Sequence, residues 1–358
     1  MTLIAGYIIN SCPVLMGDVL ISSARAPGPS VSLPSWHTDT RAPVGDQLQI
    51  VGMTQKVNII SDQVCFAWAG SHVQARLFAR SLTEHINEHG VGHVKMLEFL
   101  KSIDGADRSD LQCILNTVDG GLLKRYHLGA SEYECDGLMV QTGGSGVGHF
   151  LDAISFFFKQ PGSVDKSAYA ILAPGLSYIA SAFGEQIFTG GGLSDGWGGA
   201  FELAFYANGR FQKIDDVLYL FWTATENPDG SILLKPYPYI VKTNYFDETL
   251  VVHVADNSCP NPSTRIYNIS PLGKNDCRRH HPHFSFTYLV NFILLDKADG
   301  NKLGVTNVRT KDSSAGCTID QREGALHLEF TSNFIDMLCS DSFGKGRTRL
   351  SNAQENEL

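Results

Sequence analysis

The N-terminal stretch TLIAGYIINSCPVLMGD, residues 2–18, decides the architecture expected for this chain. Its apolar residues lie on either side of a turn-forming Asn-Ser-Cys-Pro sequence, which predicts two strands at residues 2–10 and 13–23. Thr2 stands at the head of the first strand. Once Met1 is removed, Thr2 would carry a hydroxyl nucleophile and an α-amine, whose ordinary pKa of about 7.7–8.0 suits it to accept the hydroxyl proton. An ordinary N-terminus is the alternative, and the residues downstream favour the nucleophile.

The composition is that of a folded, moderately acidic protein. The chain has 358 residues, enough for one large domain or for one domain with a smaller appendage. Its net charge is −9, with no block of like charge, which argues against a nucleic-acid partner. No apolar run reaches the roughly 18 residues of a membrane span, and the N-terminus lacks the basic segment of a signal peptide. The eight cysteines are scattered without a disulfide spacing pattern, so a reducing compartment, the cytoplasm, is expected.

The first 225 residues show hairpins and helices in alternation. The expected elements are hairpins at 47–60 with 63–69, at 111–128 and at 200–214, and helices at 71–90, 94–103, 148–159 and 165–187. This order predicts two sheets covered by helices on both outer faces. Residues 24–46 contain four prolines and several turn formers, which predicts a long loop insertion.

From residue 226 the amino-acid composition of the sequence changes. Segments such as SILLKPYPYIVKTNYF are rich in aromatic and β-branched residues, and polar loops join them. We therefore predict a mainly β C-terminal extension over residues 226–344, followed by a polar tail over residues 345–358. The predicted first domain is residues 1–225, interrupted by the insertion at 24–46.

Four further motifs follow Thr2 along the chain in a defined order. Asp18 ends the second strand, and Lys56 stands at the start of a hairpin. Fourteen residues after Lys56, the strand FAWAG leads through Gly70 into a helix, and Ser145 stands within Gly-Ser-Gly before another helix. Together these motifs resemble the proteasome-type β subunits and HslV-like peptidases of the N-terminal-nucleophile (Ntn) hydrolase superfamily. The resemblance covers about the first three fifths of the chain.

The resemblance implies an α+β fold, a four-layer αββα sandwich, ahead of the β-rich extension. It also implies that Thr2 is the nucleophile and that Lys56 lowers the pKa of the Thr2 hydroxyl and amine. Asp18 would keep Lys56 charged and oriented. The backbone N–H of Gly70, at the start of a helix, would stabilise the oxyanion, and Ser145 would hydrogen-bond the Thr2 amine.

Each of these assignments has a structural alternative. Lys56 could be an ordinary lysine at a strand edge, and Asp18 could be a turn residue. Gly70 could serve only to permit a tight turn between strand and helix. Ser145 could be the N-cap of the following helix.

The family also has an aspartate and a serine near its last helix-to-strand turn, and here the match is poor. Alignment of the Gly-Gly pair at residues 198–199 places Ser194 where the aspartate is expected and Trp197 where the serine is expected. A shift of one residue brings Asp195 to the aspartate position. Ser194 and Asp195 are therefore both candidates for supporting the site. If neither reaches Thr2, a catalytically inactive relative is favoured.

The substrate pocket is expected beside the strands that flank the insertion. If the alignment holds, Ile21, Ser22, Thr54 and Trp68 border it, and the bulk of Trp68 makes it shallow. The insertion at 24–46 would hang next to this cleft as a specificity lid or an interface arm containing Trp36 and His37. A tolerated surface insertion is the equal alternative.

The predicted function is that of a threonine-type Ntn hydrolase, which cleaves amide bonds in peptide or protein substrates through an ester on Thr2. No metal or organic cofactor is required for this chemistry. The resemblance implies a homo-oligomer, because proteasome-type relatives form rings. The alternatives are a catalytically inactive structural or regulatory subunit, an interaction module carried by the extension, and a small-molecule amidase.

One cluster in the extension has the residue types of a metal site. Cys277 and His280 have a workable ligand spacing, and the other members are Cys259, His281 and His283. Because Cys259 has no paired partner nearby, a solvated loop is expected in place of a zinc site.

Overall fold

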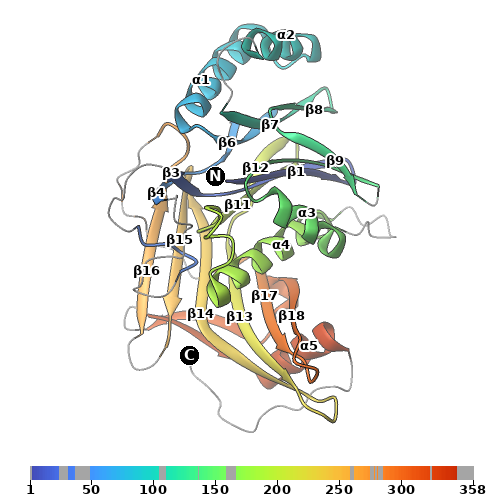
Figure 1. The fold of residues 1–358 in the computed structure, drawn as a ribbon, viewed down its shortest axis with the longest axis vertical. Coiled ribbons are helices and arrows are strands. Elements are labelled where there is room, and N and C mark those ends of the chain that lie inside the picture. The colour runs from blue at the N-terminus through green and yellow to red at the C-terminus, as the bar shows by residue number, and fades with distance from the viewer. Residues whose placement is uncertain are drawn as a thin grey trace.

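The computed structural model describes residues 2–23, 31–36, 49–104, 110–135, 137–158, 167–258, 262–274, 278, 280, 285–322 and 325–344. Within these ranges the chain is an α+β protein with five α-helices and several antiparallel sheets. Figure 1 shows the sheets and helices stacked along the long axis of the molecule. None of the helices in this part of the chain combines the length and the apolar composition needed to cross a membrane.

The N-terminal hairpin forms the middle of a six-stranded antiparallel sheet, called the first sheet below. Its strands are β1 (Leu3–Ile9), β2 (Cys12–Asp18), β9 (Ser131–Cys135), β10 (Leu138–Gly144), β11 (Phe201–Ala207) and β12 (Arg210–Lys213). They pair in the order β12-β11-β2-β1-β10-β9. Asn10 and Ser11 form the turn between β1 and β2, both with positive φ. The predicted hairpin is therefore present.

The predicted strand at residues 13–23 is wrong in one respect, because it is broken in two. β2 ends at Asp18, and β3 (Leu20–Ser23) leaves the first sheet to pair with β4 (Gln49–Met53). The side chain of Asp18 accepts the N–H of Leu20 at 3.3 Å, and the N–H of Val19 donates to the carbonyl of Ala200 at 3.1 Å. These two bonds turn the chain at the end of β2.

A second, four-stranded sheet lies next to the first. It contains β5 (Val57–Ser61), β6 (Val64–Gly70), β7 (Leu111–Asp119) and β8 (Leu122–Leu128), in that order. The predicted strand 47–60 is also broken, since β4 and β5 belong to different sheets and residues 54–56 separate them. Apolar side chains from both sheets meet in one buried cluster, in which Ile4 and Leu15 join Val57, Cys65 and Ala67.

Helices cover the other face of each of these two sheets. α1 (His72–His89) and α2 (His93–Asp104) pack on the four-stranded sheet, where Phe78 lies between Phe66 and Phe99. α3 (Val147–Phe157) and α4 (Ala168–Thr189) share a core with the first sheet, and the ring of Tyr7 lies 4.7 Å from that of Phe158. The predicted helices at 71–90, 94–103, 148–159 and 165–187 are confirmed with small shifts at their ends, apart from residues 159 and 165–166, which lie outside the described residues.

The C-terminal part forms a third large sheet. Its strands are β13 (Val217–Glu226), β14 (Ile232–Phe246), β15 (Thr249–Asp256), β16 (Ser263–Ile269), β17 (Tyr288–Asp296) and β18 (Lys302–Thr310). They pair in the order β16-β15-β14-β13-β17-β18, and β13 and β17 run parallel. One face packs on α4, as Figure 1 shows, and the other is covered by β19 (Cys317–Arg322), β20 (Ala325–Phe330) and α5 (Ser332–Phe343). A central strand of this sheet, β13, begins at Val217 and ends at Glu226, where the predicted extension begins. The proposed division of domains stays a prediction.

Candidate active site

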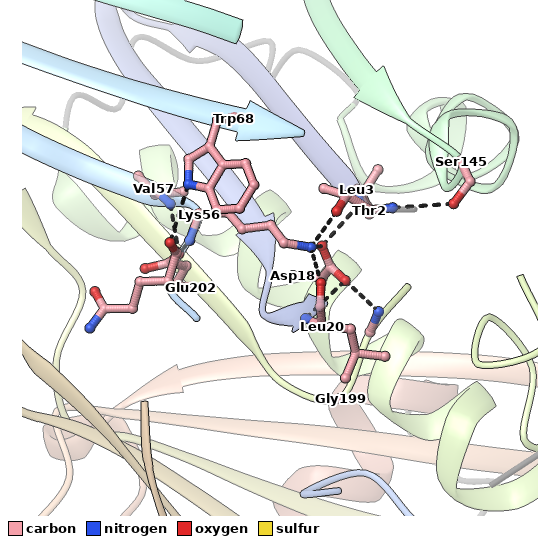
Figure 2. A network of polar contacts seen from close by, with 12 residues as sticks. Thr2, Leu3, Asp18, Leu20, Lys56, Val57, Trp68, Ser145, Gly199 and Glu202 are labelled. Carbon is pink, nitrogen blue, oxygen red and sulfur yellow. Dashed lines mark hydrogen bonds and ion pairs between the residues drawn. The ribbon is translucent and has the colours of Figure 1, made fainter. Parts of the chain in front are cut away.

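Thr2 and Lys56 meet at the buried edge between the first two sheets. The Nζ of Lys56 donates hydrogen bonds to the Oγ of Thr2 and to the carbonyl of Leu20, and it lies 2.8 Å from Oδ1 of Asp18. The exposed fractions of Thr2, Lys56 and Asp18 are 2%, 1% and 0%. Figure 2 shows the ammonium of Lys56 between the Thr2 hydroxyl and the Asp18 carboxylate. Three residues that are distant in sequence are thus brought into direct contact.

Asp18 is held in place by backbone N–H groups as well as by Lys56. Its Oδ1 accepts the N–H of Leu3 at 3.0 Å, and its Oδ2 accepts the N–H groups of Leu20 at 3.3 Å and Gly198 at 2.8 Å. A buried carboxylate needs such donors to offset the loss of hydration. These bonds tie three segments of the chain to one side chain, so Asp18 is more than a residue in a turn.

Burial sets the charge behaviour of Lys56. Removal from water lowers the pKa of the Lys56 ammonium below its ordinary value, while Asp18 and, more weakly, Glu202 raise it. The net direction is downward. In its protonated form the Lys56 side chain, in contact with a hydroxyl, can stabilise negative charge that develops on that hydroxyl oxygen.

The glycine-rich turn before α3, residues 143–146, contacts the main chain of Thr2. Ser145 Oγ accepts the main-chain N–H of Thr2 at 3.3 Å and donates to the carbonyl of Asp195 at 3.0 Å, while the N–H of Gly146 donates to the Thr2 carbonyl at 3.1 Å. Gly144 has φ +92°, and a Cβ there would lie 1.9 Å from the Thr2 carbonyl oxygen. Only glycine allows this approach. The N-cap of α3 is Gly146, without a side-chain bond, so the N-cap alternative for Ser145 is wrong.

Gly70 makes the turn from β6 into α1. Its φ is +91°, and a Cβ would lie 1.8 Å from the carbonyl oxygen of Asp110. The next residue, Ser71, donates its N–H to that same carbonyl at 2.8 Å and caps α1 through its side chain. The geometry requires glycine for the turn. The oxyanion role of the Gly70 N–H stays a prediction.

The turn between α4 and β11 contacts Ser145 through its main chain. Ser194 and Asp195 are exposed, and the contact with Ser145 comes from the main-chain carbonyl of Asp195. Trp197, by contrast, is buried, and a Cβ added at Gly146 or Gly192 would lie 3.1 Å or 2.8 Å from its ring. The structure therefore gives the turn a position next to Ser145, and the roles of Ser194 and Asp195 stay predictions.

The predicted pocket residues lie on both sides of the strand breaks. Ile21 and Ser22 are half-buried on β3. Thr54 is buried, with its N–H on the carbonyl of Val19 at 2.9 Å and its hydroxyl on the carbonyl of Ser270 at 3.2 Å. Trp68 is fully buried and belongs to the core between the four-stranded sheet and its helices. These contacts connect the expected pocket to the C-terminal part of the chain at Ser270.

Part of the insertion packs on the third sheet. The carbonyls of Pro34 and Leu33 accept the hydroxyls of Tyr239 at 2.7 Å and Tyr267 at 3.1 Å. Leu33 is buried beside Leu20, the residue whose carbonyl accepts the Lys56 ammonium. Trp36 is half-buried, and His37 lies outside the described residues, as do 24–30 and the rest of 37–48.

Glu202 is the one buried acidic residue at the site that the sequence analysis did not single out. Its Oε1 accepts the N–H groups of Lys56 and Val57, the latter at 2.7 Å, and its Oε2 accepts the ammonium of Lys213. Glu202 is 2% exposed and lies in the apolar strand FELAFYA. A carboxylate between phenylalanine and leucine in a strand was the signal that could have identified it.

The candidate metal ligands fall mostly outside the structure that is described. This holds for Cys259, Cys277, His281 and His283, whereas His280 stacks on the ring of Phe246 at 5.1 Å. Among the residues that the structure does describe, no group of three or more His, Cys, Asp or Glu side chains could hold a metal ion.

Comparisons with known proteins find no match for this chain, either among protein-family models or among curated protein sequences.

Proposed function

We propose that the protein is a threonine-type Ntn hydrolase, which cleaves amide bonds in peptide or protein substrates once Met1 has been removed. The observation that carries the proposal is the contact of the Lys56 ammonium with both the Thr2 hydroxyl and Asp18 in a buried site. A buried lysine on a threonine hydroxyl at the head of the first strand has a chemical purpose in this mechanism.

The proposal includes the fold, a four-layer αββα sandwich with a C-terminal extension. Its support is the packing of two sheets through a common apolar cluster, with α1 and α2 on the outer face of one and α3 and α4 on the outer face of the other. The resemblance to proteasome-type subunits leads us to propose a homo-oligomer, and the scattered cysteines lead us to propose a cytoplasmic location.

The proposed reaction proceeds through an ester on Thr2. The Thr2 Oγ bonds to the carbonyl carbon of the amide, and its proton passes to the Thr2 α-amine and then to the departing nitrogen. The C–N bond breaks, the amine product leaves, and the acyl group stays on Oγ. Water then attacks the ester carbonyl, its proton passing through the α-amine to Oγ, which restores the free hydroxyl and releases the acid.

The charged groups around Thr2 fit this sequence of steps. The positive charge of Lys56 favours the alkoxide form of Oγ, and it also disfavours protonation of the neighbouring α-amine. Asp18 compensates the charge of Lys56 at 2.8 Å. In this proposal Ser145 orients the amine, since its Oγ lies 3.3 Å from the Thr2 nitrogen, and the Gly70 N–H stabilises the oxyanion.

The second candidate is a catalytically inactive subunit of the same fold. The observation that favours it is the exposure of Ser194 and Asp195, since the contact of this turn with Ser145 is made by a main-chain carbonyl. In that case the Lys56–Asp18 pair would have a structural role only.

The experiment that separates the two candidates is labelling of the N-terminus. Intact mass and N-terminal sequencing of the purified protein would be determined before and after treatment with a peptide epoxyketone, which reacts with both the hydroxyl and the amine of an N-terminal threonine. The hydrolase proposal expects a chain that starts at Thr2 and one adduct, which Thr2→Ala abolishes. A chain that retains Met1 and takes no adduct would contradict the self-activated mechanism and favour the inactive subunit.

A further inference from the structure

We propose that Glu202 is a positioning residue, which fixes the main chain at Lys56 so that the Lys56 ammonium stays on the Thr2 hydroxyl. This inference rests on the proposed function, because it assigns Glu202 a purpose in the reactivity of Thr2.

Lys56 lies in the break between β4 and β5, where a strand ladder does not fix its N–H. The N–H groups of Lys56 and of Val57 both donate to a single oxygen, Oε1 of Glu202. The carbonyl of Lys56 accepts the N–H of Trp68 at 3.0 Å. The main chain at Lys56 is therefore held on one side by β6 and on the other by the carboxylate of Glu202.

Glu202 and Asp18 approach the same lysine from neighbouring strands. In the pairing of β11 with β2, Phe201 lies opposite Asp18 and Glu202 lies opposite Gly17. A Cβ at Gly17 would lie 3.4 Å from the Cβ of Lys56, so the stem of the lysine passes directly over this glycine. Asp18 thus binds the ammonium end of Lys56 while Glu202 binds its main-chain end (Figure 2). Two acidic side chains of one sheet fix both ends of a residue that belongs to neither strand.

The carboxylate of Glu202 is itself held by a second lysine. Oε2 accepts the ammonium of Lys213, whose Nζ also donates to the carbonyl of Val57 at 2.5 Å and to Oε1 of Gln55 at 3.3 Å. The hydroxyl of Tyr245 lies 3.4 Å from Oε2 of Glu202. Lys213 therefore compensates the buried charge of Glu202 and contacts the residues on both sides of Lys56.

Substitution of Glu202 by glutamine tests the charge, and substitution by aspartate tests the reach. Glu202→Gln keeps an oxygen acceptor in place, whereas Glu202→Asp keeps the charge but withdraws the carboxylate by one methylene group. The charged side chains in contact with Lys56 or with its main chain are Asp18 and Glu202, with Lys213 behind Glu202. Loss of the negative charge favours deprotonation of Lys56.

The first measurement follows Lys56 directly and does not depend on activity. In protein labelled with ¹³C at the lysine ε-carbon, the Lys56 resonance is assigned by its loss in Lys56→Arg and titrated with pH. We expect the Lys56 titration to move to lower pH in Glu202→Gln and to stay in place in Glu98→Gln, where an exposed glutamate of α2 is changed. Because Glu202→Gln keeps an acceptor for the main-chain N–H groups, an unchanged Lys56 resonance and titration in both Glu202→Gln and Glu202→Asp would overturn the inference.

The second measurement is the rate at which the epoxyketone labels Thr2. We expect Glu202→Asp to label on the order of 10²-fold more slowly than the wild type, because displacement of a catalytic group by about one ångström has an effect of that size. Equal rates in Glu202→Asp and wild type would also overturn the inference. If the wild type itself is not labelled, the proposed function fails, and the Lys56 titration still decides whether Glu202 positions Lys56.

A folding defect is distinguished with a charge-balanced variant. If Glu202→Gln is poorly folded, as shown by its thermal unfolding, the pair Glu202→Gln with Lys213→Met removes both buried charges and the titration is repeated on that protein. The reference for the balanced variant is Lys213→Met alone, which differs from it at residue 202 only. An identical Lys56 titration in these two proteins would show that the charge of Glu202 does not act on Lys56.

Discussion

Lys56 and Asp18 form an ion pair of 2.8 Å in which both side chains are withdrawn from solvent, with exposed fractions of 1% and 0%. Exposed ion pairs add little to stability, whereas a buried pair that loses one partner leaves an uncompensated charge in the interior. The pair is therefore sensitive to changes in either residue, and its two members can be tested separately.

Asp18→Asn should lower the free energy of unfolding by about 3–5 kcal/mol at pH 7, because the Lys56 ammonium then loses its counter-charge in a buried site. Urea denaturation followed by circular dichroism measures this change. The matched control is Asp18→Asn combined with Lys56→Met, which removes both charges. It should be more stable than Asp18→Asn alone, and equal stability of the two variants would contradict the assignment of the pair.

The labelling rate of Thr2 should depend on pH through two groups. It should rise with pH as the α-amine loses its proton, at a pH below the ordinary α-amine pKa of about 7.7–8.0, because Lys56 disfavours protonation of the amine and the base must be neutral. At still higher pH the labelling rate should fall again as Lys56 loses its proton. This fall should begin at a pH below 10.5, because burial lowers the pKa of Lys56 from that value. Lys56→Arg keeps a charge at high pH, so any residual labelling in this variant should lack the alkaline fall. An alkaline fall that persists there would assign the upper limb to another group.

Gly144→Ala should disrupt the site, whereas Gly148→Ala should not. Gly144 has a positive φ and no space for a Cβ beside the Thr2 carbonyl, while Gly148, in α3, has no atom within 4 Å of its Cβ position. We expect Gly144→Ala to be destabilised by more than about 1 kcal/mol and to lose Thr2 labelling. Gly148→Ala should be unchanged or stabilised by up to about 1 kcal/mol. Thermal unfolding and Thr2 labelling of both variants test these expectations. Normal labelling of Gly144→Ala would contradict the close approach of Gly144 to the Thr2 carbonyl.

His253 should make the protein acid-sensitive. Burial on β15 and then the nearby charge of Lys242, its cross-strand neighbour, lower the pKa of His253 to about 4. The unfolded chain, with a histidine pKa of about 6.5, binds a proton that the folded protein does not bind between these values, so stability should fall as pH falls from 6.5 to 4. The total change expected is about 3 kcal/mol. Urea denaturation at pH 7 and pH 4.5 should show a weaker pH dependence in His253→Gln, and the same dependence in both proteins would contradict this.

The local parts of the fold could be predicted from the sequence because short-range chemistry determines them. Asn10 and Ser11 adopt the positive φ expected of a turn, and Ser71 caps α1 directly after the glycine that ends β6. The contacts of Thr2, Lys56 and Asp18 follow the resemblance. The breaks after Asp18 and before Val57 were not predicted, because the main chain there is hydrogen-bonded to the side chains of Asp18 and Glu202. No sequence periodicity reports such contacts.

The third sheet shows a second limit of the sequence. β13 was assigned to the first part of the chain, yet its neighbour β17 runs parallel to it, with Val217 opposite Tyr288. Parallel strands that lie this far apart in the sequence, at Val217 and Tyr288, have no local sequence signal comparable to the Asp-Gly turn of a hairpin. The contacts of Glu202 were missed for a related reason, because the partners of this buried carboxylate at Lys56 and Val57 lie far away in sequence.

Helix α4 packs against two sheets of the same chain, the first sheet and the third. The ring of Phe183 lies 5.1 Å from that of Phe201 in the first sheet and 5.1 Å from that of Tyr219 in the third, and a Cβ on Gly184 would lie 2.4 Å from the ring of Phe292. The side of the helix that faces away from the first sheet is thus already occupied. A second copy of the protein could not dock there without displacing the protein's own strands, so any self-assembly must use other surfaces.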